Sequence, residues 1–175
     1  NWEWFNSLAT IIPQEKCFPI YRKMQNPFWE EKIKKIRSRY GNEALEADDV
    51  MKHILRNPND GNSAYMFVAD QTPHISMVNF GLKFLNQKTP VFVGYDRLSG
   101  RMNVTFVYCE MEKIKRGHYR VTYHEIPPTN QKFEPYEVVK KFHQNLEKTI
   151  NKNPDNWLWS HRKWKYKDAI KHFDE

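Results

Sequence analysis

The sequence predicts an α/β domain in which a central, mostly parallel or mixed sheet is flanked by helices. Residues 64–69 are apolar on both alternating faces, which suits a strand that helices cover on two sides. Residues 118–124 alternate strictly between apolar and polar, which is typical of a half-exposed strand. Apolar residues recur three and four positions apart between residues 138 and 150, which predicts an amphipathic helix.

The first third of the chain predicts three helical segments and one strand. Apolar side chains in residues 2–12 favour a helical opening, and residues 17–21 are interpreted as a short strand. Residues 29–40 carry apolar side chains at helical spacing. A further helix has its apolar face between residues 47 and 55.

The second half predicts a hairpin followed by a helix. Residues 103–109 form another largely apolar run, and residues 115–117, Lys-Arg-Gly, indicate a turn between this run and the strand at 118–124. We therefore expect these two strands to be antiparallel neighbours. Pro135 suits the first turn of the helix that follows, and Asn153-Pro154 ends it.

Composition and charge limit the possible partners without choosing among them. The chain has 175 residues and a formal net charge of +7, which favours an anionic partner. Nucleic acid, an anionic membrane surface, a phosphorylated lipid and an acidic protein all fit. No stretch approaches the roughly 18–20 consecutive apolar residues that span a bilayer. Basic residues that recur close together are interpreted as solvated surface, among them Lys163, Lys165 and Lys167.

No metal and no cofactor are predicted. Cys17 and Cys109 are the only cysteines, and their wide separation favours neither a zinc site nor a disulfide framework. Reduced thiols are the simplest interpretation. No histidine has partners at the spacing of metal ligands.

Three segments carry candidate functional residues. Asp70 and Gln71 directly follow the apolar run 64–69, where a strand commonly delivers polar side chains to a site. The chain opens with Asn-Trp-Glu-Trp at residues 1–4, and residues 153–164 combine several tryptophans with His161 and Arg162. In order and spacing these segments resemble the late, lauroyl- or myristoyl-type acyltransferases of lipid A biosynthesis, a branch of the glycerolipid acyltransferase superfamily.

The resemblance implies a His-x4-acid pair in which Glu3 is the acidic member. The histidine would lie three residues before Asn1, and the carboxylate would orient it as the base. Residues 1–175 are therefore expected to be a single acyltransferase-like domain, the C-terminal portion of a longer membrane-associated protein without its N-terminal anchor and catalytic histidine. Such a fragment is expected to be inactive. An acid near a helix start also stabilises the helix dipole without any catalysis, so this alternative stays open for Glu3.

The resemblance further implies a second catalytic acid, Asp70, and a set of substrate-binding residues. An arginine offers a fork of donors to a phosphate of the acceptor. Two other interpretations remain open, in which Asp70 caps the following turn and Asn26 shapes the turn before Pro27. The expected substrate-binding residues are Arg22, Asn26, Gln71, Gly94, Arg97 and Arg162.

The function implied is transfer of a fatty acyl chain to a hydroxyl of a phosphorylated lipid A precursor or a related glycolipid. The donor would be a thioester of acyl carrier protein or coenzyme A, and the enzyme would work at the cytoplasmic face of the bacterial inner membrane. One alternative is a basic nucleic-acid-binding module. The chain has no recognisable nucleic-acid-binding signature, so nucleic acid is not expected as a partner. The other is a peripheral membrane protein without catalysis.

Overall fold

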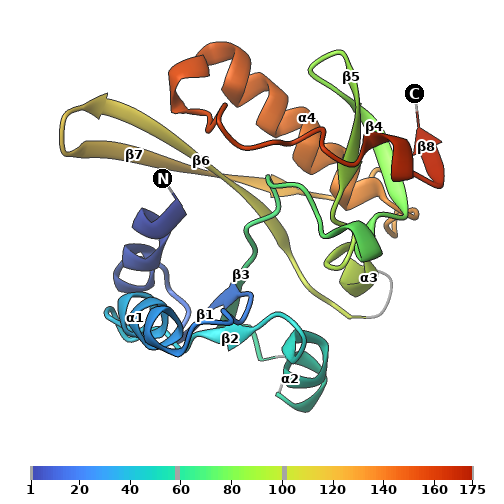
Figure 1. The fold of residues 1–175 in the computed structure, drawn as a ribbon. Helices are drawn as coiled ribbons and strands as arrows, with labels where there is room; N and C mark the ends of the chain where they lie inside the picture. The colour runs from blue at the N-terminus through green and yellow to red at the C-terminus, as the bar shows by residue number, and fades with distance from the viewer. Residues whose placement is uncertain (1, 58–59, 100–101, 175) are drawn as a thin grey trace. The chain divides into compact units, whose positions relative to one another are not determined.

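The computed structural model describes residues 2–57, 60–99 and 102–174, with residues 2 and 3 described by their backbone alone (Figure 1). Contacts within the chain divide it into two compact units, Asn1–Val68 and Ala69–Glu175, and each is described by itself. The interpretation of residues 1–175 as one domain stays a prediction.

A parallel three-stranded sheet organises the first unit. Strand β1 (Lys16–Tyr21) lies in the middle, with β2 (Leu45–Glu46) on one side and β3 (Ser63–Met66) on the other. Both neighbours run parallel to β1. The strand expected at residues 17–21 is confirmed, and its apolar side chains are buried on both faces because it is the central strand.

Three helical segments accompany this sheet. The opening segment forms a 3₁₀ helix, η1 (Trp2–Thr10), and not an α-helix. Helix α1 (Pro27–Arg37) ends before the predicted limit at residue 40. Helix α2 (Val50–Arg56) overlaps the predicted segment, because it begins after residue 47 and ends one residue past 55. The side chain of Asn26 caps α1, because its Oδ1 accepts hydrogen bonds from the amides of Phe28 and Trp29 at 3.0 and 3.3 Å.

The predicted buried strand at residues 64–69 is shorter and less covered than expected. Strand β3 ends at Met66, which pairs with Pro19, and its residues are only half-buried. Val68 is exposed. The ladder ends at the Pro19–Met66 pair, and residues 67–69 continue outside the sheet toward Asp70.

A second small sheet stands at the core of the second unit. Strands β4 (Phe80–Phe84) and β5 (Gln87–Val91) form an antiparallel hairpin, and β8 (His172–Asp174) joins β4 in parallel. Leu85 and Asn86 between β4 and β5 both have positive φ, 47° and 59°, which is the geometry of a two-residue hairpin turn. The sequence analysis did not predict these strands.

The predicted antiparallel hairpin is confirmed. Strand β6 (Phe106–Lys115) pairs with β7 (His118–Ile126), and Gly117 takes a positive φ of 78° in the turn between them. The register is irregular between Lys113 and Lys115, as in a β-bulge.

Helix α4 (Glu137–Lys152) packs against β4 and β6, as its apolar stripe predicts (Figure 1). Its buried apolar residues are Val138, Val139, Leu146 and Ile150. The short helix α3 (Asp96–Ser99) supplies a cap for it, because the carboxylate of Asp96 accepts a hydrogen bond from the Tyr136 amide at 2.8 Å. Three 3₁₀ turns complete the unit: η2 (Ile75–Met77), η3 (Pro154–Asn156) and η4 (Lys167–Ala169).

The α/β class is thus confirmed, with the strands distributed over three small sheets instead of one central sheet. In the part of the chain that the structure describes, every helix is too short or too polar to cross a bilayer.

His143 of α4 is part of the core of the second unit. Its side chain is buried, its Nδ1 donates to the Val139 carbonyl at 2.8 Å, and its ring meets the Phe84 ring edge-on with centroids 5.5 Å apart. Burial, together with the positive charge of Lys163, lowers the pKa of His143 to about 3. The imidazole is therefore neutral in the folded protein.

We predict that acid destabilises the protein through His143. Its folded pKa lies below the ordinary value of 6.5, so the unfolded chain binds more protons, and stability falls as pH drops from about 6.5 toward 3. Relative to His143→Gln, the wild type should lose about 1.4 kcal/mol of unfolding free energy per pH unit well below pH 6.5. Urea titrations at several pH values measure this. The exposed His172→Gln is the matched control, and parallel pH profiles for wild type and His143→Gln would contradict the prediction.

Candidate active site

Two segments far apart in sequence, residues 70–72 and 161–163, are hydrogen-bonded to each other in the second unit; we call this pair of segments the clasp. The amide of Thr72 donates to Nε2 of His161 at 2.9 Å. The Thr72 hydroxyl lies 2.5 Å from the carbonyl oxygen of Lys163 and 3.1 Å from that of Arg162. The clasp therefore joins the predicted acid-amide pair to the predicted closing motif.

Lys163 stabilises the clasp from inside. Its relative exposure is 0%, and its ammonium donates to the backbone carbonyl of Gln71 at 3.2 Å. Burial lowers the pKa of Lys163 to about 8, and the negative charge of Asp70 opposes that shift. A buried ammonium needs both an acceptor and a nearby negative charge, and residues 70 and 71 supply them.

Asp70 lies in the same environment. Burial raises the pKa of its carboxyl group, and the positive charge of Lys163 opposes that rise. A carboxyl group with a raised pKa, held by a rigid support, is suited to proton transfer or to orienting a partner, and such groups are concentrated at functional sites.

His161 serves as a hydrogen-bonded partner of the backbone. Its Nε2 accepts from the backbone, so a neutral ring carries its proton on Nδ1. Burial, followed by the charge of Lys163, lowers the pKa of His161. Both effects favour the neutral ring that accepts the Thr72 amide.

The tryptophans of the closing motif behave differently from one another. Trp164 ties the clasp to β5, because its indole N–H donates to the Thr89 hydroxyl at 2.8 Å. Trp157 is half-buried near Phe84. Trp159 is exposed, and its indole N–H donates to the Pro154 carbonyl.

The other predicted residues of the second unit lie around α3 and the clasp. The Arg162 side chain is exposed, whereas its carbonyl accepts from Thr72. Gly94 lies between β5 and α3, where a Cβ would collide with the Phe92 ring. Arg97 is exposed on α3. Gln71 contributes its backbone carbonyl to the clasp.

Three predicted residues belong to the first unit. Glu3 lies in η1, but its side chain is outside the described part of the structure. Arg22 is exposed directly after β1. Asn26 is exposed, and its side chain caps α1.

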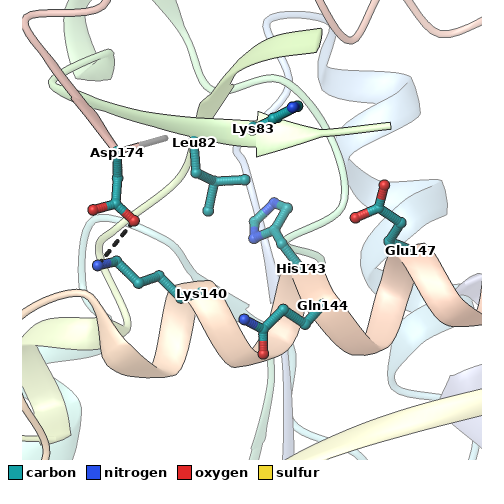
Figure 2. A pocket seen from close by; sticks show the side chains of 7 residues that line it. All are labelled: Leu82, Lys83, Lys140, His143, Gln144, Glu147 and Asp174. Atoms are coloured by element: carbon teal, nitrogen blue, oxygen red, sulfur yellow. Dashed lines mark ion pairs between the residues drawn. The ribbon is translucent and has the colours of Figure 1, made fainter. Parts of the chain in front are cut away.

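A shallow hollow on the second unit is lined by none of the predicted residues. It has a volume of about 120 Å³ and lies between α4, β4 and β8 (Figure 2). Lys140 and Asp174 form an ion pair of 2.9 Å at its edge. Because its charged groups are of both signs, it favours no particular ligand. Its lining residues are Leu82, Lys83, Lys140, His143, Gln144, Glu147 and Asp174.

Metal-binding groups do not gather in the described ranges: no cluster of three His, Cys, Asp or Glu side chains there could hold an ion. Cys17 and Cys109 are both free thiols. Burial raises the pKa of each to about 11, so neither is a ready thiolate.

Sequence reasoning missed Lys163 and Thr72. Lys163 was interpreted as solvated surface together with Lys165 and Lys167; the latter two are exposed, but Lys163 is wholly buried. The error arose because a lysine in a basic, aromatic tail is usually solvated, and only the long-range contact with residues 70–72 shows otherwise. Thr72 gave a faint signal, since it directly follows the acid-amide pair.

Comparison with known proteins agrees with the motifs. The family model described as bacterial lipid A biosynthesis acyltransferase matches residues 1–166. The chain therefore belongs to the bacterial lipid A biosynthesis acyltransferase family, which implies an acyltransferase that uses an acyl donor and a lipid acceptor. No curated protein matched the chain.

We predict that Lys163→Met weakens the clasp and changes the titration of Asp70. The variant keeps most of the side-chain volume but removes the donor to Gln71 and the charge near Asp70. Unfolding free energy should fall by about 1–3 kcal/mol. The pKa of Asp70 should rise further, because the positive charge that favours its carboxylate is gone. Chemical denaturation and NMR titration of the Asp carboxyl groups measure the two effects.

The exposed Lys167→Met is the control for removing a positive charge from the same tail. An Asp70 titration that is the same in Lys163→Met and the wild type would show that the lysine does not act on that carboxyl group.

Proposed function

We propose that this acyltransferase moves a fatty acyl chain from a thioester of acyl carrier protein or coenzyme A to a hydroxyl of a phosphorylated lipid A precursor or related glycolipid. Family membership supports the reaction class. The clasp is the main reason for placing the active site at residues 70–72 and 161–163. It joins the acid-amide pair to the closing motif through a buried lysine.

In the proposed reaction, a histidine removes the proton of the acceptor hydroxyl. The oxygen then attacks the thioester carbonyl carbon, the C–S bond breaks, and the leaving thiolate receives the proton from the imidazolium. The family pattern puts this histidine three residues before Asn1 and assigns its orientation to Glu3. Asp70 is proposed as the second catalytic acid of this site.

Arginines are proposed to bind the acceptor phosphate. Arg22, Arg97 and Arg162 all have exposed side chains. A guanidinium can donate two parallel hydrogen bonds to one phosphate, which makes arginine suited to this role. We assign Asn26, Gln71 and Gly94 to the walls of the substrate site, with the missing side chain of Gly94 leaving room for the Phe92 ring.

We propose that the enzyme acts at the cytoplasmic face of the inner membrane, because this location fits the proposed substrates. The acceptor is a lipid, and acyl carrier protein is acidic. The net charge of +7 attracts both an acidic donor protein and an anionic membrane surface.

The test is acyl transfer by the protein expressed from its complete gene. We expect transfer of a labelled acyl chain from acyl carrier protein or coenzyme A to a phosphorylated lipid A precursor. Asp70→Asn should lower kcat by about 100-fold or more, because it removes a titratable carboxyl group at nearly constant shape. Product analysis by mass spectrometry measures both donor and acceptor use.

Asp168→Asn, an exposed change in the same unit, is the matched control and should keep wild-type turnover. Thermal unfolding of both variants separates a catalytic loss from a folding defect. Wild-type turnover by Asp70→Asn would remove this residue from the catalytic site, and transfer to unphosphorylated acceptors at equal rates would contradict the proposed phosphate recognition.

A further inference from the structure

Helix α1 is held on the first unit by its charged side. Glu30 accepts a hydrogen bond from the Tyr21 hydroxyl at 2.9 Å and forms an ion pair with Lys34 at 3.2 Å. Lys34 also lies 3.7 Å from the carboxylate of Glu46 in β2. Arg37 donates to the carbonyl of Ile20 in β1 at 3.3 Å. The charged side of α1 thus supplies hydrogen bonds and ion pairs to the sheet.

The opposite side of α1 carries its large apolar side chains. Phe28, Trp29 and Ile36 are 59%, 53% and 47% exposed, and no residue of α1 is buried. At 3.6 residues per turn, Lys32 lies on this side between Phe28 and Ile36. Surface helices normally turn the apolar stripe toward the core. In α1 only Ile33 of the large apolar residues is half-buried, and the other three are exposed.

Two cations lie beside these apolar groups, and the exposed Glu31 lies in the same turn of the helix. Lys32 and Lys35 are exposed, and the ammonium of Lys32 lies 5.8 Å from the centroid of the Phe28 ring. We call Phe28, Trp29, Ile36, Lys32 and Lys35 the α1 face. Exposed apolar side chains with cations beside them are typical of an interaction site.

We propose that the α1 face binds the headgroup region of an anionic lipid bilayer. Phe28 and Trp29 enter the boundary between headgroups and acyl chains, while Lys32 and Lys35 contact lipid phosphates. The proposal deepens the proposed function, since the acceptor is a lipid, yet vesicle binding requires no turnover. A chain that binds vesicles but transfers no acyl group leaves this inference standing.

The chemistry of the face favours lipid over an acidic protein. Tryptophan and lysine both suit the depth of the headgroups, because each has an apolar body and a polar end. The face projects from a single helix that has charged contacts below it. Such a helix lies flat on a bilayer with its apolar side down.

The experiment is co-sedimentation of the chain with vesicles of equal parts phosphatidylcholine and phosphatidylglycerol, and with vesicles of phosphatidylcholine alone. We expect binding to the anionic vesicles that weakens as salt is added. Phe28→Ala/Trp29→Ala and Lys32→Gln/Lys35→Gln should each lower the partition coefficient by about tenfold or more. Because all four side chains are exposed, circular dichroism and thermal unfolding should match the wild type.

Helix α2 of the same unit supplies matched controls. Leu55 is an exposed apolar residue there, and Lys52 and Arg56 are exposed cations. Leu55→Ala and Lys52→Gln/Arg56→Gln should leave vesicle binding within about twofold of the wild type.

Several results would overturn the proposal. One is wild-type vesicle binding by both α1 variants, and another is equal loss in the α2 controls. Failure of the wild type to bind anionic vesicles would do the same. Self-association in sedimentation velocity that Phe28→Ala/Trp29→Ala abolishes, without an effect on vesicles, would assign the face to a second copy. The same pattern with acyl carrier protein would assign it to the donor protein.

Discussion

A lysine side chain with no solvent exposure imposes a strict condition on the segments around it. The ammonium of Lys163 must find an acceptor and a compensating charge, and it takes both from residues 70 and 71. Thr72 closes the arrangement by donating to the backbone of the opposite segment. The position of the acid-amide pair thus depends on a residue about ninety positions later in the chain.

Folded proteins usually bury apolar side chains and expose charged ones, and both units depart from this pattern. In the second unit, Lys163 and Asp96 lie inside, and each satisfies backbone groups: Lys163 the Gln71 carbonyl and Asp96 the start of α4. In the first unit, α1 contacts its sheet through charged groups and leaves Trp29 exposed. Such costly arrangements are concentrated at functional sites. We therefore connect the clasp with catalysis and the exposed side of α1 with a membrane.

The local spacing of apolar residues was sufficient to predict the longer helices and strands. The β6–β7 hairpin and α4 were predicted because their apolar spacing extends over many residues. The β4–β5 hairpin escaped prediction: its turn uses Leu85 in a conformation that usually favours Asn or Gly, so it lacks the common turn signal. Strand β8 has only three residues, and its pairing with β4 is a long-range contact.

By itself, the sequence determined the α/β class, the family and the segments that carry the acid-amide pair and the closing motif, because these depend on residue types at short spacing. Only the tertiary structure decided that Lys163 is buried, that Trp159 is exposed and that α1 leaves Phe28, Trp29 and Ile36 exposed. Burial depends on contacts between residues distant in the chain. A lysine in a basic tail has the same local pattern whether its ammonium faces water or the Gln71 carbonyl.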